Sequence, residues 1–382
     1  MNNYYRDSYL EINVDTMLSN LKEIKEKCSS DKFLYAVIKG NGYGHGIIEM
    51  ATMAQASKAD GLAVATLDEA LIVRKYIKDM KILCLGIIRE QDYLIAAQHD
   101  ITLTIANSTS IEHILNCNLV KDIKVHIKVN TGMNRIGFKE ISEIEDAIEQ
   151  LSTNDKIEIE GIFTHFATAD GEQLREYFDM QFAKFKETIE NLSYDFKHIH
   201  CSNSGTLLKH YDKMDFCTAT RVGIAMYGGL EDEALNNFDV KAGLRLISTI
   251  NQVQQYPVGA KIGYSNNYTV LSENEYIATI PLGYADGFPR LLTGSKVKCN
   301  EQYGTIVGSI CMDQMMISFD NKVEIGEQVI LMDLDKELDV FARAKHAQTI
   351  THEIYTNFTS RLPRIYLENN VITNINNSLS KE

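Results

Sequence analysis

The segment Val37–Gly46 (VIKGNGYGHG) holds the residues best suited to chemistry, because a lysine follows an apolar run and precedes four alternating glycines. Lys39 ends an expected strand over residues 33–39, so its amine is partly removed from water. Desolvation lowers the pKa of a lysine and favours its use as a nucleophile that forms a Schiff base. The glycines allow the backbone to approach a bulky cofactor closely. A solvated lysine in a flexible loop remains the alternative interpretation of this segment alone.

Known nucleotide-binding motifs do not account for this segment. Gly40 and Gly42 begin a dinucleotide fingerprint, but position 45 is histidine where that fingerprint requires glycine, and the residue order of a P-loop is also absent.

Eight short apolar runs lie before residue 235 or so, and helical patterns separate them. This number and order of elements is typical of a (β/α)8 barrel. The expected strands are 33–39, 61–65, 81–86, 101–105, 124–130, 157–166, 198–201 and 218–222. The expected helices are one capped by Asp15 and running to Cys28, one opened by a Thr66/Glu69 capping box and running to Tyr76, and a longest one over 171–192. Barrel active sites lie at the carboxyl ends of the strands, where Lys39 is expected. An open doubly wound sheet is the alternative fold.

The remainder of the chain has a different texture, with β-branched, alternating runs between turn residues and all four prolines. This pattern predicts a mostly antiparallel β domain in which only 336–348 is helical. We therefore expect a barrel domain over 1–235, including a short N-terminal strand that packs on the β domain, and a β domain over 236–382.

Composition excludes several classes of function. The chain has 382 residues, 38 Lys and Arg against 52 Asp and Glu, and a net charge of −14, which argues against a nucleic-acid partner. The seven cysteines are scattered without any Cys-x-x-Cys pair, so neither a disulfide framework nor a metal site is expected. The sequence has no apolar run of about 18 residues and no signal peptide, so we expect a cytoplasmic protein without membrane association.

Several motifs in order resemble those of the alanine racemase family, over about residues 6–366. They are the Lys39 segment, His126–Gly137, Thr164–Phe166, His200–Gly205, Arg221–Gly228, Gly263–Tyr264, Pro281–Gly287, Cys311–Gln314 and Arg361–Arg364. The resemblance implies a fold type III enzyme that uses pyridoxal 5'-phosphate (PLP) to interconvert L- and D-alanine, and so supplies D-alanine for peptidoglycan.

The resemblance also assigns roles to individual residues. Lys39 binds PLP and is one acid/base catalyst, and Tyr264 is the other, on the opposite face of the substrate Cα. Arg221 contacts the pyridine nitrogen, to which an arginine cannot give up a proton. Tyr43 and Ser204, with the backbone amides of Gly223 and Ile224, form the phosphate site.

Further residues complete the implied site. The other cofactor-binding residues are Asn203, His165, Arg135 and His352, with His200 supporting Arg221. Arg135 also meets the substrate carboxylate, together with Met312, Asp313 and Tyr284, and Lys128 is a hypothetical carbamylation site. The family geometry implies a homodimer in which the β domain of one subunit completes the barrel site of the other.

Some positions depart from the family pattern. His352 stands where the family places a tyrosine beside the phosphate and the substrate side chain, which widens the pocket and predicts turnover of serine or another amino acid larger than alanine. Ser309 replaces a common arginine of the access channel, and Gly40 and Gly42 replace alanines, which is expected to loosen the loop. A PLP-dependent amino-acid decarboxylase of the same fold type is the alternative, but it requires an acidic partner for the pyridine nitrogen where this chain has Arg221.

Overall fold

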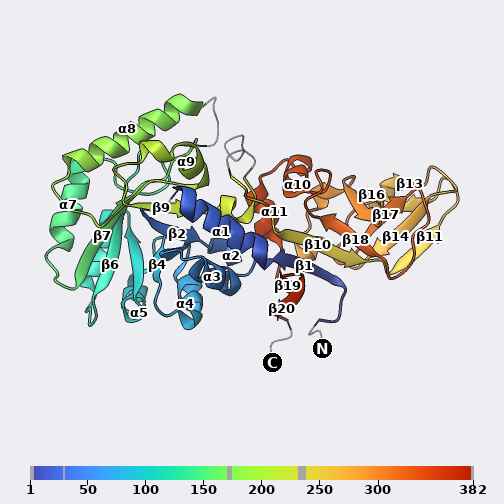
Figure 1. Cartoon of the computed structure of the whole chain (residues 1–382), viewed down its shortest axis with the longest axis horizontal. Helices are drawn as coiled ribbons and strands as arrows, with labels where there is room; N and C mark the ends of the chain where they lie inside the picture. The colour runs from blue at the N-terminus through green and yellow to red at the C-terminus, as the bar shows by residue number, and fades with distance from the viewer. Residues whose placement is uncertain (1–3, 29–30, 170–173, 231–237, 380–382) are drawn as a thin grey trace.

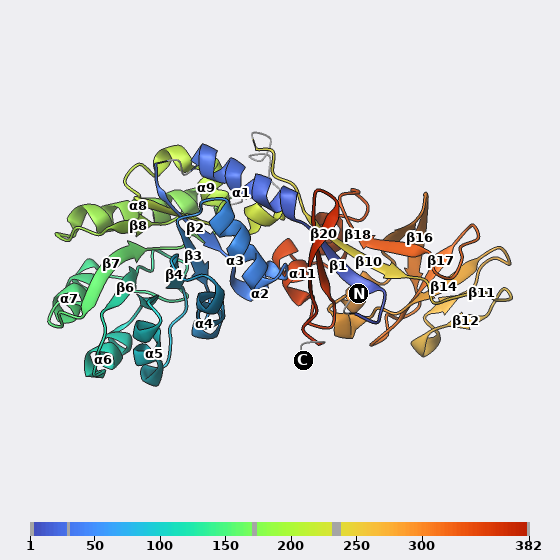
Figure 2. The ribbon, with the colours of Figure 1, turned by 60° about the horizontal axis from the view of Figure 1, so that its bottom comes forward.

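The computed structural model describes residues 4–28, 31–169, 174–230 and 238–379. It has two parts, a barrel surrounded by helices and a large β-sheet that extends away from it (Figures 1 and 2). Within the described residues, no helix is long and apolar enough to cross a membrane.

Eight parallel strands form the barrel, in the spatial order β8-β7-β6-β5-β4-β3-β2-β9. They are β2 (Phe33–Val37), β3 (Gly61–Val64), β4 (Lys81–Cys84), β5 (Ile101–Ile105), β6 (Ile123–Lys128), β7 (Ile157–Phe163), β8 (His198–His200) and β9 (Ala219–Val222). The last strand returns to pair with the first, and the Thr218 amide donates to the Ile199 carbonyl (3.0 Å) across the remaining gap between β8 and β9. This nearly closed ring confirms the barrel and excludes the open doubly wound sheet.

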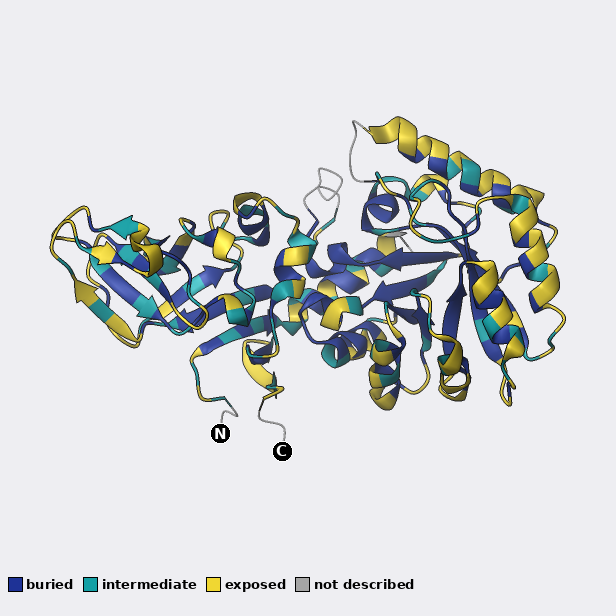
Figure 3. Ribbon diagram, turned by 180° about the vertical axis from the view of Figure 1, so that it is seen from behind, coloured by how far each residue is buried: buried dark blue, intermediate teal, exposed yellow. Residues whose placement is uncertain are grey.

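Helices cover the outside of the barrel, with buried residues along the strands and exposed residues on the outer helix faces (Figure 3). The helices of this part of the chain are α1 (Val14–Cys28), α2 (Lys39–Tyr43), α3 (Ile47–Ala56), α4 (Leu67–Tyr76), α5 (Tyr93–Gln98), α6 (Ser108–Asn116), α7 (Ile141–Leu151), α8 (Arg175–Asn191) and α9 (Ser204–Lys209). The Thr66/Glu69 capping box of α4 is confirmed. The N-cap assignment of Asp15 is wrong, because Asn13 accepts from the Thr16 amide (2.8 Å) and Asp15 lies in the first turn. Part of the expected helix over 171–192 falls on 171–173, outside the described residues.

The second part is a ten-stranded sheet in the order β11-β14-β17-β16-β15-β18-β10-β1-β19-β20. Its strands are β1 (Ser8–Asn13), β10 (Leu244–Thr249), β11 (Gln252–Gln255), β14 (Tyr276–Ile280), β15 (Lys296–Cys299), β16 (Gln302–Val307), β17 (Met315–Phe319), β18 (Gln328–Met332), β19 (Arg364–Glu368) and β20 (Val371–Asn376). Strand β1 lies between β10 and β19, so the N-terminal segment belongs to this sheet. The expected boundary at 235/236 lies outside the described residues.

Two helices accompany this sheet, α10 (Val340–His346) and α11 (Thr351–Asn357), so the prediction of a single helix over 336–348 is wrong. The sequence of α11 is rich in residues of modest helix propensity, and packing decides its structure. Ile354 and Tyr355 are buried, and a Cβ atom on Gly44 would lie only 2.0 Å from the Tyr355 carbonyl oxygen. This close approach of α11 to α2 brings the C-terminal part of the chain to the mouth of the barrel.

Candidate active site

Lys39 lies two residues beyond the end of β2, so the expected strand over 33–39 is two residues too long, and it begins an unusual turn. Gly40, Asn41 and Gly42 have φ/ψ of 63/44°, 55/47° and 62/42°, which is left-handed helical geometry. Glycine adopts this region without the strain that other residues suffer. The turn is closed by hydrogen bonds from the amides of Gly42 to Ile38 (2.8 Å) and of Gly44 to Gly40 (2.9 Å). The glycines therefore build a tight turn that aims Lys39, instead of loosening the loop.

The capping residue Glu69 also holds this turn. Its Oε1 accepts from the Gly40 amide (2.7 Å) and its Oε2 from the Ala65 amide (2.8 Å). One carboxylate thus joins the lysine turn to the next barrel strand, a role that the capping motif alone did not reveal.

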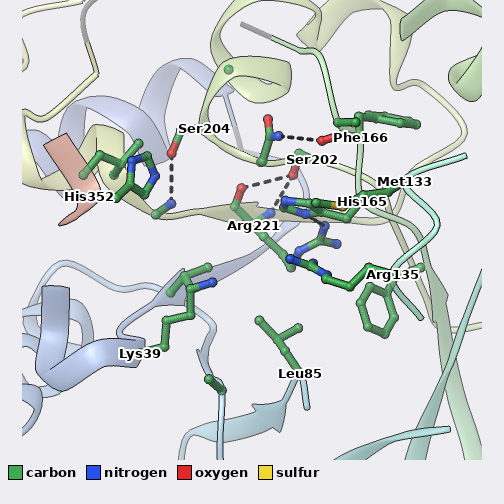
Figure 4. Close-up of a pocket in the computed structure, with 18 of the residues that line it drawn as sticks. Lys39, Leu85, Met133, Arg135, His165, Phe166, Ser202, Ser204, Arg221 and His352 are labelled. Carbon is green, nitrogen blue, oxygen red and sulfur yellow. Dashed lines mark hydrogen bonds between the residues drawn. The ribbon is translucent and has the colours of Figure 1, made fainter. Parts of the chain in front are cut away.

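A pocket of about 570 Å³ opens at the carboxyl ends of the barrel strands (Figure 4). It brings together eleven of the predicted site residues: Lys39, Tyr43, Lys128, Arg135, His165, Asn203, Ser204, Arg221, Gly223, Ile224 and His352. Sequence reasoning missed its apolar lining, including Leu85, Met133, Phe166, Leu230 and Ile350, because such residues carry no chemical signature.

The other four predicted residues do not line this pocket. Tyr264, Tyr284 and Met312 are 71%, 41% and 53% exposed, and Asp313 forms an ion pair with Arg361 (2.8 Å). Tyr264 lies between β12 (Lys261–Ile262) and β13 (Tyr268–Thr269), at the end of the sheet farthest from the barrel (Figures 1 and 2). Within one chain, therefore, Tyr264 and Lys39 are far apart.

Arg221 is a buried anchor of the pocket floor. It extends from β9, and its guanidinium donates to His200 Nδ1 and to the carbonyl oxygen of Thr164 (2.9 Å). His165 Nδ1 lies 3.4 Å from the same guanidinium. Burial lowers the pKa of Arg221 to about 10, so it remains a cation at neutral pH.

The pocket concentrates positive charge. Lys39, Lys128, Arg135 and Arg221 line it, and no described lining residue is acidic. Burial, with Arg135 and Arg221 nearby, lowers the pKa of Lys39, and burial with the same two arginines lowers the pKa of Lys128 to about 7. Such a site stabilises an anionic ligand, and the lowered pKa values favour the unprotonated form of both amines.

One side of the pocket offers a cradle of small donors. Ser204 Oγ accepts from the amides of Gly223 and Ala225 (both 3.1 Å), so its own proton is free to point at a ligand. A Cβ atom on Gly223 would lie 2.7 Å from Tyr43 Oη, which makes glycine the residue that fits there. Asn203, the residue before Ser204, caps α9 by accepting from the Thr206 amide (2.9 Å).

His352 closes the pocket from α11. Its ring lies 5.8 Å from that of Tyr43, and burial together with Lys39 lowers its pKa. It therefore faces the pocket as a neutral imidazole at physiological pH. His352 reaches the pocket because α11 packs on the barrel, and the sequence analysis did not predict this packing.

Comparison with known proteins assigns the family. The family model "Alanine racemase, N-terminal domain" matches residues 12–231 and "Alanine racemase, C-terminal domain" matches residues 243–366. A curated alanine racemase from Pediococcus pentosaceus is 37% identical, with 96% of this chain and 98% of the relative covered. The crystal structure of alanine racemase from Bacillus anthracis with bound L-Ala-P has a TM-score of 0.92 at 35% identity, covering 98% of this chain and 99% of that one.

A relative with a different named substrate is also similar. The structure of a histidine racemase from Leuconostoc mesenteroides subsp. sake has a TM-score of 0.86 at 30% identity, covering 95% of this chain and 98% of that one. Both family models together span nearly the whole sequence and confirm the resemblance on which the site was predicted. The chain belongs to the alanine racemase family.

Proposed function

We propose that this protein is a PLP-dependent racemase that interconverts L- and D-alanine and supplies D-alanine for peptidoglycan in the cytoplasm. The observation that carries the proposal is Lys39, a lysine of lowered pKa held by a rigid turn at the mouth of a barrel pocket in which none of the described lining residues is acidic. Family membership supports the reaction, and the alanine racemases of Pediococcus pentosaceus and Bacillus anthracis support alanine as substrate.

The donor set fits PLP, which carries an aldehyde, a phosphate and a pyridine nitrogen. Lys39 supplies the amine for the aldehyde, and Arg221 supplies a donor for the ring nitrogen. The cradle of Tyr43, Ser204, Gly223 and Ile224 suits a phosphate, since a missing Cβ atom at Gly223 leaves room for the Tyr43 hydroxyl. Asn203, His165, Arg135 and His352 complete the cofactor site.

When bound, PLP withdraws electrons from the Cα of an attached amino acid and makes its α-hydrogen acidic. Racemisation then needs one group to remove that proton and another to deliver a proton to the opposite face. Lys39 Nζ acts on one face, where its lowered pKa favours the unprotonated amine. Arg221 keeps its own proton, so the ring nitrogen stays unprotonated and side reactions are limited.

The second acid/base group comes from the other subunit of a homodimer. Tyr264, Met312, Asp313 and Tyr284 do not line the pocket of their own chain, and Tyr264 is 71% exposed at the tip of the sheet. We infer that this tip enters the barrel of a second copy, where Tyr264 Oη exchanges the proton on the far face. Met312, Asp313 and Tyr284 then bind the substrate together with Arg135.

Lys128 is a candidate for carbamylation. With a pKa of about 7 it is largely a free amine at slightly alkaline pH, and such an amine adds CO2 and releases one proton. The resulting anion offsets the excess of positive charge and orients Arg135. Native mass spectrometry in the presence and absence of bicarbonate tests this, and an unmodified mass under both conditions contradicts it.

Broader amino-acid specificity is the second candidate function. A specific observation favours it: His352, a smaller side chain than tyrosine, faces a pocket of about 570 Å³. The similarity to a histidine racemase is consistent with substrates larger than alanine within this fold. The decarboxylase alternative receives no support, since no described residue that lines the pocket is acidic.

The test begins with the colour of the purified protein and its loss on borohydride reduction. L-alanine and a panel of other L-amino acids are then incubated with the protein, and the D-enantiomers are detected. A Tyr264→Phe protein is expected to bind PLP yet to lose proton transfer on one face. Unchanged racemisation by that variant would remove Tyr264 from the mechanism, and failure to racemise any amino acid would contradict the proposed activity.

A further inference from the structure

A chain of polar side chains runs through the interior of the barrel, beneath the pocket. It begins at Arg221 and continues through His200 and His126 to Glu160, each of which is at most 3% exposed. We call these four residues the inner relay. His126, His200 and Glu160 do not line the pocket, so direct contact with a ligand does not explain their burial.

Donation along the inner relay has one direction. A guanidinium only donates, so His200 Nδ1, which faces Arg221, must be an unprotonated acceptor. A neutral His200 then carries its proton on Nε2, which lies 2.8 Å from His126 Nδ1. His126 Nδ1 must in turn be the acceptor, which leaves the His126 proton on Nε2.

Glu160 is the last residue of the inner relay. Its Oε2 lies 3.5 Å from His126 Nε2, and neither atom forms a hydrogen bond within the described residues, so these two buried polar atoms face each other. A carboxylate oxygen only accepts, so it selects the Nε2–H form of His126. The other carboxylate oxygen, Oε1, pairs with Lys81, with Lys197 Nζ at 3.7 Å and His198 Nε2 at 3.8 Å.

The charges agree with this arrangement. Burial lowers the pKa of His126 and, with Arg221 nearby, holds the pKa of His200 well below its usual range, so both rings are neutral. Although burial alone raises the pKa of Glu160, His126 and Lys81 hold it well below its ordinary value. A permanent anion thus stands at one end of the inner relay and a permanent cation at the other.

We propose that Glu160 is a positioning residue, which fixes the tautomers of His126 and His200 and thereby keeps an acceptor nitrogen facing Arg221. With the tautomers reversed, a protonated His200 Nδ1 would oppose the guanidinium donor to donor and displace it from the pocket floor. The consequence for catalysis rests on the proposed function, because it requires that Arg221 hold the cofactor ring. The tautomers themselves do not depend on that function.

Glu160→Gln is the informative variant because Lys81 remains. Lys81 only donates, so it retains the single amide oxygen and turns the amide NH2 toward His126. His126 Nε2 must then accept, and the protons of both histidines move to Nδ1. In the double variant Glu160→Gln/Lys81→Met the amide oxygen is released and can face His126, which restores the original tautomers. Glu158→Gln, an exposed carboxylate on the same strand β7, is the matched control.

Nitrogen-15 spectra of histidine-labelled full-length protein report the tautomers, with assignments from single His126→Asn and His200→Asn variants. We expect both rings as Nε2–H in the unmodified protein and in Glu158→Gln, as Nδ1–H in Glu160→Gln, and as Nε2–H again in the double variant. An Nδ1–H ring at His126 or His200 of the unmodified protein would overturn the proposal even if Glu160→Gln does not fold. So would an unchanged pair of tautomers in a folded Glu160→Gln protein.

Kinetics supply the second readout. Because Arg221 acts on the cofactor ring and not on substrate binding, Glu160→Gln is expected to lower kcat about tenfold or more while KM changes little, and the double variant is expected to recover most of the loss. A lower kcat with unchanged tautomers contradicts the relay. A third outcome is that Glu160→Gln inverts the tautomers but neither this variant nor the unmodified protein racemises any amino acid. That result would refute the proposed function and leave the positioning role of Glu160 standing.

Discussion

The barrel mouth and the tip of the β-sheet prepare their residues for chemistry in opposite ways. At the barrel mouth, Lys39, Lys128 and Arg221 are held in a crowded, cationic pocket, and burial shifts the pKa of each. At the tip, Tyr264 is 71% exposed. The barrel strands pack into the main hydrophobic core, whereas Ile262, two residues before Tyr264, belongs to a small separate cluster with Val270, Ile277 and Val307.

The backbone near Tyr264 is nevertheless constrained. Gly263, Ser265 and Asn266 have φ of 75°, 60° and 52°, and Asn267 donates to Ser309 Oγ (2.7 Å). Non-glycine residues in this region carry strain that the surrounding contacts must offset. Under the proposed dimer, the tip is a shaped half-site without a formed pocket, and the barrel mouth is a half-site that already has its electrostatic environment. This difference suggests that association, and not folding of one chain, completes the catalytic environment of Tyr264.

Separating the two half-sites gives the largest expected effect. Lys39→Ala and Tyr264→Phe are each expected to lower kcat by about a thousandfold or more, because each removes one of the two proposed acid/base groups. The two variant proteins are then mixed in equal amounts, unfolded together and refolded. Half of the resulting dimers contain one chain of each variant, and in each mixed dimer one of the two sites has both groups intact. About a quarter of the wild-type rate should therefore return.

The mixing experiment has a clear control and a clear contradiction. Tyr303→Phe replaces an exposed tyrosine in strand β16 of the same part of the chain and should keep full activity. A mixture with no more activity than its separate components would show that Lys39 and Tyr264 do not meet across a subunit interface.

Gly223→Ala tests the cradle at the barrel mouth. The added Cβ atom would meet Tyr43 Oη at 2.7 Å, and overpacking of about 1–3 kcal/mol would weaken PLP binding about ten- to hundredfold. Adding Tyr43→Phe relieves the clash and should recover part of the affinity. Ser309→Ala at the tip should instead lower kcat with PLP affinity unchanged. Equal losses of PLP affinity in Gly223→Ala and Ser309→Ala, measured by cofactor absorbance titration, would remove the distinction between the two regions.

Sequence patterns predicted the residues at the barrel mouth better than the packing contacts that hold those residues in place. Parallel strands buried on both faces appear as apolar runs, so the strand ends that carry Lys39, His165 and Arg221 were predictable. The left-handed turn at Gly40 and the position of His352 depend on packing between α2 and α11, which local sequence does not encode. Glu160 did leave a signal, as a carboxylate within the otherwise apolar end of strand β7. The two histidines of the inner relay, His126 and His200, come from two other strands, so only the closed barrel shows which groups the carboxylate is linked to.

Lys128 tests whether burial in the barrel pocket sets the electrostatics of that region. Its lowered pKa determines whether stability rises or falls with pH. The folded-state value of about 7 lies below the ordinary lysine value, so between about pH 7 and 10 the unfolded chain binds more protons and stability rises with pH. Lys128→Met should therefore stabilise the protein by about 2 kcal/mol at pH 7 in CO2-free buffer, and by less than half of that near pH 9.5.

A second lysine on the same strand β6 provides the matched control for thermal unfolding at the two pH values. Lys124 pairs with Asp100 (2.8 Å), and although burial alone would lower its pKa, Asp100 raises it. Lys124→Met should destabilise slightly, by less than about 1 kcal/mol. A Lys128→Met protein that is less stable at pH 7 than at pH 9.5, relative to the unmodified protein, would contradict the burial argument.

His352 connects the two regions, since it belongs to the C-terminal part of the chain yet lines the barrel pocket. Its ring leaves more room than a tyrosine would, so the unmodified protein should racemise serine or another amino acid larger than alanine. His352→Tyr should lower the ratio of kcat/KM for serine to that for alanine about tenfold, as expected for the loss of space for one or two heavy atoms. His346→Tyr on the neighbouring helix α10 is the control, because its ring bonds to the Thr293 carbonyl outside the pocket. If the unmodified protein acts on alanine alone, or if both histidine variants change the ratio equally, substrate breadth is not set by α11 and must be sought in the half-site proposed to come from the second copy.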